Sequence, residues 1–246
     1  MTRTPDDEFK IDLRGDVTVE LVKHSAADSD VLFAARVSTL GEQSLEELDK
    51  DPERSKGLIN YLMRDRHGSP FEHNSMTFFV SAPIFVFREF MRHRVGWSYN
   101  EESGRYRELQ PVFYVPDASR KLVQQGRPGK YVFVEGTEEQ HELLGGAMED
   151  SYRQAYRTYQ ELLAQGIARE VARSVLPVGL YSSMYATCNA RSLMHFLGLR
   201  TQHELAKVPS FPQREIEMVG EKMEAEWAKL MPLTYAAFNA NGRVAP

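Results

Sequence analysis

The sequence predicts a protein of the α+β class, with a mixed, mostly antiparallel sheet flanked by helices. Three observations predict this class. Stretches that alternate like strands lie between stretches with helical spacing. They follow no regular strand–helix–strand repeat, and no glycine-rich phosphate loop accompanies them. Residues 137–163 have the apolar spacing of one long amphipathic helix. We therefore expect a single domain over residues 1–246.

The first half of the chain is expected to hold strands at residues 17–22 and 75–81, and helices at residues 28–37, 53–66 and 84–92. Ser25 or Asp28 suits the N-cap of the first helix. Pro83 suits the first position of the third helix, where an N–H group has no intrahelical partner. Residues 1–15 are polar and expected to be loose, and the charged residues 42–53 are expected to be solvated.

The second half is expected to hold helices at residues 137–163, 168–176, 190–199 and 214–230, and a strand at residues 180–188. Gly145 and Gly146 could interrupt the long helix, and Pro177 ends the one after it. Asn189 suits the N-cap of the helix that follows the strand. Cys188 lies on the apolar face of that strand, where a small apolar side chain is wanted.

Composition bounds the class of protein. Of the 246 residues, 42% are hydrophobic, which suffices for a sizeable core. The net charge of −5 gives no general basic field for nucleic acid or for an acidic membrane. A single cysteine excludes an internal disulfide and a multi-cysteine metal site. The N-terminus lacks the apolar core of a signal peptide, and no apolar run approaches a membrane span. We expect a soluble, cytoplasmic protein.

Residues 92–105, RHRVGWSYNEESGR, are the most informative stretch. Arginine guanidinium groups bind phosphate in a bidentate manner, and hydroxyl groups and the backbone N–H groups around a glycine add hydrogen-bond donors. A carboxylate can order a ribose or an imide. The pattern therefore indicates a site for an anion with an attached ring. The alternative is a charged surface turn.

Three further blocks carry polar groups in unusual density. Residues 67–73, HGSPFEH, could supply metal ligands from His67, Glu72 and His73, although the spacing matches no zinc helix and the alternative is a proline turn. Arg173 precedes a Leu-Pro stop, and a lone helical arginine is usually a surface cation. Arg191, His195 and Leu199 recur every four residues, so they share one helical face.

These blocks together resemble the flavin-dependent thymidylate synthases. The family signature has Arg-His-Arg followed by a Ser-x-Asn/Ser-Glu/Gln-x-Ser-x-Arg run, and blocks similar to His-x-x-Pro-Phe-Glu-His and Ala-Arg-x-Val-Leu-Pro occur at residues 67–73 and 172–177. The resemblance spans roughly residues 30–220. It departs from the family in four places. Eight residues, not seven, separate Arg94 from Ser103, Glu89 stands in place of a common Gln, His195 in place of a common Asn, and His203 lies three rather than four residues after Arg200.

The resemblance implies roles for particular residues. It implies that Arg200 is catalytic and that the nucleotide, deoxyuridine monophosphate (dUMP), is bound by Glu89, Arg92, Glu101, Glu102, Ser103, Gly104, Arg105, Arg173 and Arg200. It implies that flavin adenine dinucleotide (FAD) is bound by Ser38, His67, Ser69, Glu72, Arg92, His93, Arg94, Asn189, Arg191, His195 and Leu199. No metal ion is implied.

The implied activity is the reductive methylation of dUMP to thymidylate (dTMP) for de novo thymidylate synthesis. Methylenetetrahydrofolate gives the carbon, NADPH gives the hydride and FAD carries it. The family shares its active sites between the subunits of a homotetramer, so a homotetramer is expected. Two alternatives are a non-enzymatic nucleotide or RNA binder that uses residues 92–107, and a metal-dependent hydrolase built on His67, Glu72, His73 and His93.

Overall fold

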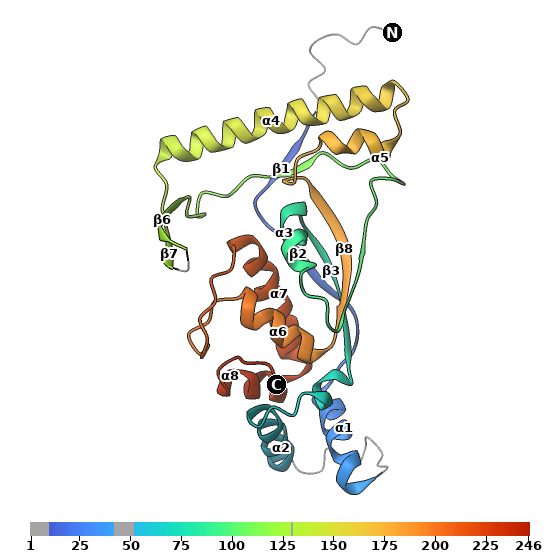
Figure 1. Ribbon diagram of the computed structural model, residues 1–246, viewed down its shortest axis with the longest axis vertical. Helices are drawn as coiled ribbons and strands as arrows, with labels where there is room; N and C mark the ends of the chain where they lie inside the picture. The colour runs from blue at the N-terminus through green and yellow to red at the C-terminus, as the bar shows by residue number, and fades with distance from the viewer. Residues whose placement is uncertain (1–9, 42–51, 129) are drawn as a thin grey trace. The chain divides into compact units, whose positions relative to one another are not determined.

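The computed structural model describes residues 10–41, 52–128 and 130–246, and Figure 1 shows their helices and strands. The chain forms two compact units. The first unit takes residues up to Asp16, Ser81–Phe87 and Glu101–Ser183, and the second takes Val17–Val80, Arg88–Asn100 and Met184–Pro246. The predicted α+β class, with mixed and mostly antiparallel sheets, is confirmed. The single domain over residues 1–246 stays a prediction.

The main sheet has four strands in the order β2-β3-β8-β4, which are Thr18–Ser25, Ser75–Pro83, Tyr181–Cys188 and Trp97–Glu101. Strand β3 alternates between half-buried and buried residues, as a strand with one face in the core must. The hydroxyl groups of Thr77 and Thr187 lie 2.9 Å apart across β3 and β8. The predicted strands at 17–22, 75–81 and 180–188 are therefore confirmed.

The helices of the second unit are α1 (Asp28–Leu40), α2 (Pro52–Arg64), α6 (Ala190–Arg200), α7 (Arg214–Leu230) and α8 (Pro232–Ala240), with the 3-10 turn η2 at Ser69–Glu72. Helix α7 packs against α6 and α8 (Figure 1). Its apolar face includes Met223 and Trp227, both fully buried. Asn189 caps α6 as predicted, because its side chain accepts a hydrogen bond from the Ser192 N–H group at 2.9 Å.

The first unit is built on α4 (Glu138–Ala164), with α5 (Arg169–Ala172) and the 3-10 turn η3 (Arg173–Val175) beside it. Strand β1 (Asp12–Arg14) runs parallel to β5 (Val112–Tyr114), and β6 (Val123–Arg127) pairs antiparallel with β7 (Lys130–Val134). Tyr152, Tyr156 and Tyr159 of α4 pack into a core with Phe113 and Leu180. The Tyr152 and Tyr156 hydroxyls donate to the carbonyls of Tyr114 and Leu109, so α4 anchors the segment that carries β5.

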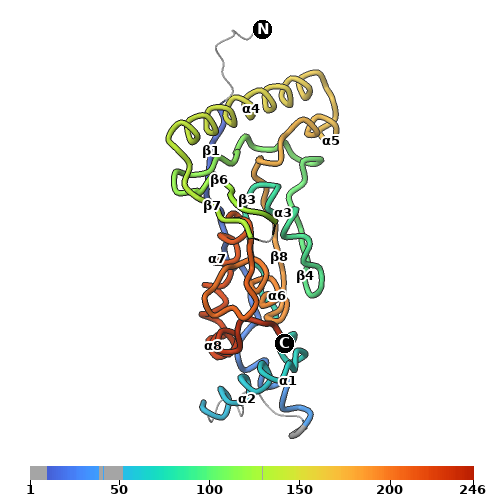
Figure 2. The backbone as a smooth tube through the Cα atoms, turned by 60° about the vertical axis from the view of Figure 1, so that its left-hand side comes forward, coloured from blue at the N-terminus to red at the C-terminus, as the bar shows by residue number. Residues whose placement is uncertain are grey.

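Several expected boundaries were wrong. Helix α4 is unbroken through Gly145 and Gly146, as Figure 1 and Figure 2 show, and its buried residues Tyr152, Tyr156 and Tyr159 all follow the two glycines. The helix expected at residues 168–176 is instead α5 followed by η3. Pro83 ends β3 and does not begin α3 (Ile84–Phe90), which stops before the Arg-His-Arg triplet.

The N-terminal region also differs from expectation. Residues 12–14, expected to be loose, form β1, and Ala27 is the N-cap of α1. The carboxylate of Asp28 instead caps α8, accepting hydrogen bonds from the N–H groups of Leu233 and Thr234, both at 2.8 Å. Most of the charged stretch 42–53 lies outside the described residues, and Pro52 and Glu53 begin α2.

Candidate functional site

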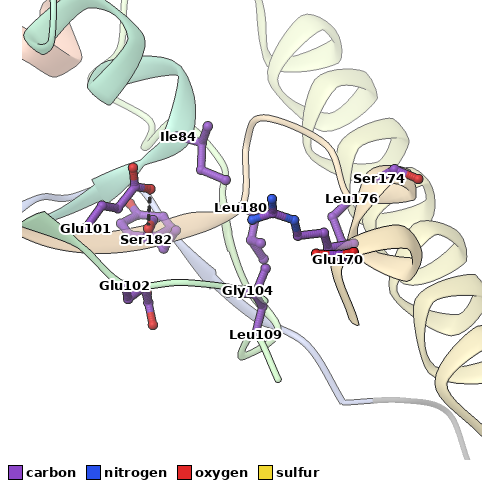
Figure 3. Close-up of a pocket in the computed structure, with 12 residues that line it drawn as sticks. Ile84, Glu101, Glu102, Gly104, Leu109, Glu170, Ser174, Leu176, Leu180 and Ser182 are labelled. Carbon is purple, nitrogen blue, oxygen red and sulfur yellow. Dashed lines mark hydrogen bonds between the residues drawn. The ribbon is translucent and has the colours of Figure 1, made fainter. Parts of the chain in front are cut away.

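A cavity of about 360 Å³ lies in the first unit (Figure 3). Four residues expected to bind the nucleotide line it, namely Glu101, Glu102, Gly104 and Arg173. Glu101 and Arg173 lie 72 positions apart in the sequence (173 − 101). Glu101 ends β4, which pairs with β8, and Arg173 begins η3. The cavity is therefore a real meeting point of two of the sequence blocks.

Backbone contacts hold the cavity wall in place. The Glu102 N–H group donates to the Ser183 carbonyl at 2.9 Å, which fixes the segment after β4 against β8. A Cβ atom on Gly104 would lie 2.9 Å from Leu109 Cδ1 and 3.1 Å from Arg173 Cδ. A side chain at this position would therefore force a shift, so glycine allows the chain to pass close to Arg173.

The charges around the cavity are mixed. The Ser182 hydroxyl donates to Glu101 Oε1 at 2.6 Å, the dashed line in Figure 3. The pKa of Glu101 is raised, first because its carboxylate is partly withdrawn from water, and Arg173 opposes that rise. Arg105 Nε lies 2.9 Å from Glu170 Oε2, and both side chains are exposed. Cations and carboxylates side by side suit a ligand with a phosphate and a hydrogen-bonding ring.

A second cluster, in the second unit, surrounds Arg200 at the C-terminal end of α6. Its Nη1 donates to Glu89 Oε2 at 2.6 Å, and its Nε donates to His93 Nε2 at 3.1 Å. The side chains of Arg200 and Glu89 are only 16% and 27% exposed, so this is not an ordinary surface pair. Two residues from other parts of the sequence, Glu89 and His93, thus fix one guanidinium group.

His93 is neutral in this arrangement. Burial lowers its pKa to about 4, and the neighbouring positive charge of Arg200 adds to the effect. Because Nε2 accepts from Arg200, the ring proton lies on Nδ1. The ring packs edge-on against Phe196, with centroids 4.9 Å apart. Burial also raises the pKa of Glu89, although Arg200 works against this.

The residues expected to bind flavin form a third group, also in the second unit. Arg191 Nη1 lies 2.5 Å from Glu72 Oε1 and ties α6 to η2. A Cβ atom on Gly68 would meet the Arg191 guanidinium carbon at 2.5 Å, so the turn before Ser69 lies directly against that arginine. The His195 side chain on the same helix is exposed, and partial burial together with Arg191 lowers its pKa.

Other expected site residues are not drawn into these clusters. Ser38 is exposed on α1, and its hydroxyl donates to the Ala35 carbonyl. Leu199 is exposed, and His67 stacks on Tyr61. Arg92 and Arg94 are exposed and, within the described part of the chain, form no ion pair. The Ser103 hydroxyl accepts a hydrogen bond from the Arg105 N–H group at 3.3 Å.

Sequence reasoning missed Ser182, Ser174 and Glu170, which line the cavity. The sequence could have indicated Ser182, because it is a polar residue on the otherwise apolar face of a predicted strand. The metal-hydrolase alternative gains no support, since the described residues hold no group of three or more His, Cys, Asp and Glu side chains that could bind a metal ion. None of the helices in the described ranges has the length and apolar character needed to cross a membrane.

Comparison with known proteins agrees with the site. The profile of a family described as "Thymidylate synthase complementing protein" matches residues 20–233. A "Flavin-dependent thymidylate synthase" of Streptomyces coelicolor is 89% identical over 246 residues, 100% of both chains. One from Tropheryma whipplei is 62% identical over 94% of this chain and 95% of that one.

A solved structure is also similar. It is described as the UMP/dUMP methylase PolB from Streptomyces cacaoi bound with 5-Br dUMP, and it matches with a TM-score of 0.90 and 59% identity over 96% of this chain and 100% of that one. Fold, clustered site and relatives define a nucleotide-modifying enzyme of the α+β class. The chain belongs to the family of flavin-dependent thymidylate synthases. The resemblance read from the sequence is confirmed.

Proposed function

We propose that this chain catalyses the flavin-dependent reductive methylation of dUMP to dTMP, with methylenetetrahydrofolate as carbon donor and NADPH as reductant. Membership of the family, shown over residues 20–233, is the observation that carries this proposal. The names of the relatives support thymidylate as product and a flavin as cofactor, and the bound ligand of the PolB structure supports a uridine nucleotide as substrate.

Arg200 is the proposed catalytic residue. Carbon 6 of a uracil ring becomes electrophilic when negative charge on the ring carbonyl is stabilised. A guanidinium group can stabilise that charge without exchanging a proton, because its pKa is far above neutral. Glu89 and His93 hold this group on two sides, so little reorganisation is needed when charge develops.

The cavity of the first unit is the proposed place for the nucleotide. Arg173 and the neighbouring Arg105 would hold the phosphate, with Ser103 and the backbone at Gly104 as further donors. The carboxylates of Glu101 and Glu102 can accept hydrogen bonds from the ribose or the imide. Arg92 is proposed to contribute a further positive charge. Binding here orients the ring, which is a large part of catalysis in reactions of this kind.

The residues of the second unit fit a flavin dinucleotide. Its pyrophosphate is anionic, and the exposed Arg92 and Arg94, together with the half-exposed Arg191, present cations for it. Asn189 and the exposed His195 add hydrogen-bonding groups on α6. The remaining proposed contacts are Ser38, His67, Ser69, Glu72, His93 and Leu199. When bound, the flavin supplies hydride transfer, which amino-acid side chains cannot provide.

Assembly and compartment are also part of the proposal. We propose a homotetramer with shared active sites, as the family resemblance implies. The cytoplasm is the proposed compartment, supported by a lone cysteine that is buried and free.

The test is product formation from defined reactants. Purified protein is incubated with dUMP, methylenetetrahydrofolate and NADPH, each reactant is omitted in turn, and dTMP is measured by mass spectrometry. Formation of dTMP only in the complete mixture is expected. UMP is run in parallel because PolB is described as acting on both nucleotides. Formation of dTMP without the folate, or no product in the complete mixture of a flavin-loaded protein, would contradict the proposal.

A further inference from the structure

A buried ion pair lies behind the C-terminal end of α6. The side chains of Arg243 and Glu224 are 1% and 12% exposed. Arg243 Nη1 donates to Glu224 Oε1 at 2.5 Å and Nη2 donates to Glu224 Oε2 at 2.8 Å, which is the paired geometry of a fork against a carboxylate. Neither the sequence patterns nor the family resemblance gave Arg243 a role.

Such a pair is weak support for stability alone. Removing two charges from water is costly, and well-packed apolar residues often stabilise a core at least as well. The pair can instead fix geometry when several hydrogen bonds hold the guanidinium group. Nη1 of Arg243 also donates to Asn239 Oδ1 at 2.8 Å, so its two N–H groups have two different acceptors. Its backbone has a φ of +56°, a left-handed conformation that is costly for a residue with a Cβ atom and persists where the surrounding structure holds it.

The second N–H group of Nη2 connects the pair to α6. Nη2 donates to Thr201 Oγ1 at 3.0 Å, and that hydroxyl in turn donates to the Leu197 carbonyl at 2.7 Å. The Thr201 N–H group donates to the same carbonyl at 3.0 Å, so Thr201 closes the last turn of the helix. Arg200 is the last residue of that turn.

Close packing leaves this turn little freedom. A Cβ atom on Gly220 would lie 2.7 Å from Thr201 Cγ2, and one on Gly198 would lie 3.0 Å from the Arg243 carbonyl oxygen. Helix α7 and the segment after α8 thus approach the end of α6 as closely as glycine allows. Glu89 and His93 fix the guanidinium end of Arg200, and the Arg243 contacts fix its backbone end.

We propose that Arg243 is a positioning residue for Arg200, acting with Glu224 through the Thr201 hydroxyl. The inference rests on the proposed function, in which Arg200 stabilises charge on the pyrimidine. An interaction that matters only when a charge develops must be placed accurately, so a small displacement of α6 lowers turnover more than it weakens substrate binding.

The sharpest test compares Thr201→Val with Thr201→Ser in the full-length, flavin-loaded protein. Valine keeps the shape but removes the hydroxyl, whereas serine keeps the hydroxyl. We expect Thr201→Val to lower kcat roughly tenfold with KM for dUMP little changed, and Thr201→Ser to stay near wild type. Arg243→Lys should behave like Thr201→Val, because an ammonium group cannot reproduce the paired fork.

Two controls separate positioning from general loss of stability. Asp28→Asn weakens the cap of α8 without touching α6, so it should lower the melting temperature but leave kcat unchanged. In an Arg200→Lys background, Thr201→Val should cause no further loss of turnover, because there is no guanidinium group left to position. The proposal would be overturned if the double variant lost turnover by the product of the two single-variant losses. A wild-type kcat for Thr201→Val would overturn it as well.

A readout independent of turnover separates this proposal from the proposed function. Hydrogen exchange of residues 197–201 should be faster in Thr201→Val than in wild type and unchanged in Thr201→Ser. If the wild-type protein forms no dTMP, the proposed function fails and exchange still decides whether the hydroxyl holds the turn. Equal exchange in all three proteins would overturn the positioning role whatever the activity.

Discussion

Arg200 Nη1 lies 2.6 Å from Glu89 Oε2, and this contact joins the end of α6 to α3. The same guanidinium group donates to His93, so two protein contacts set its direction. Preorganised charge of this kind lowers a barrier, because the site need not rearrange as the reaction proceeds.

Replacing Arg200 by alanine should abolish turnover while flavin stays bound. We expect a loss of roughly a hundredfold or more in kcat, since the group acts on transition-state charge and not on cofactor anchoring. Steady-state rates and flavin content after desalting check this. Arg153→Ala on α4, which breaks an i,i+4 pair with Glu149 and does not line the cavity, is the control and should be active. Near-normal turnover of Arg200→Ala would remove Arg200 from the mechanism.

Arg173→Ala should weaken dUMP binding more than it slows the chemical step. The residue lines the cavity of the first unit, and loss of a phosphate contact should raise KM for dUMP at least tenfold, or roughly 1.4 kcal/mol of binding free energy. Arg169→Ala, four residues earlier on α5, is a matched control because Arg169 is exposed and does not line the cavity. If both variants raise KM equally, Arg173 has no special place in the site.

The partly buried His93 predicts a pH dependence of folding. Its pKa is lowered to about 4 in the folded protein, whereas an unperturbed histidine has a pKa of about 6.5. Between pH 6.5 and pH 4, His93 is therefore protonated in the unfolded chain but not in the folded protein. The associated stability is present above about pH 6.5 and is lost as the pH falls toward 4. His93→Gln keeps an acceptor for Arg200 but does not titrate.

The measurement is urea unfolding of both proteins across this pH range. Between pH 7 and pH 4 the wild type should lose about 2 kcal/mol more stability than His93→Gln, after allowance for partial solvent screening. Parallel pH profiles for the two proteins would show that His93 is not held neutral.

Cys188→Ala should keep most activity and remain flavin-loaded. The thiol is buried on β8, and burial raises its pKa, so it is a poor source of thiolate. The small cavity should lower the free energy of unfolding by about 1 kcal/mol. A variant that is folded and yellow yet inactive would make Cys188 the nucleophile and contradict the mechanism proposed above.

The strongly periodic elements could be predicted from the sequence. The long helix α4 and the cap of α6 follow from local patterns, because apolar spacing and the Asn189 side chain act within one element. Strand β4 was missed, since Trp97 is its only buried residue and the strand exists by pairing at the edge of the sheet. Helix α8 is short, and its cap comes from Asp28, about two hundred residues earlier in the chain.

Part of the candidate site could likewise be predicted from the sequence, and part could not. Clustered motifs pointed to four residues that line the cavity, Glu101, Glu102, Gly104 and Arg173, but not to Ser182, Ser174 or Glu170. That Glu89 and His93 both hold Arg200 could not be predicted, because those contacts span 111 and 107 residues of the chain. The role of Arg243 could not be predicted either, because its partners Thr201 and Glu224 lie on separate elements.

The most direct test of the central claim is dTMP formation before and after removal of the flavin. Protein stripped of flavin should form no dTMP from dUMP, methylenetetrahydrofolate and NADPH, and added FAD should restore both the visible flavin spectrum and turnover in proportion. Undiminished dTMP formation by the stripped protein, or a fully flavin-loaded protein that forms none, would contradict the account.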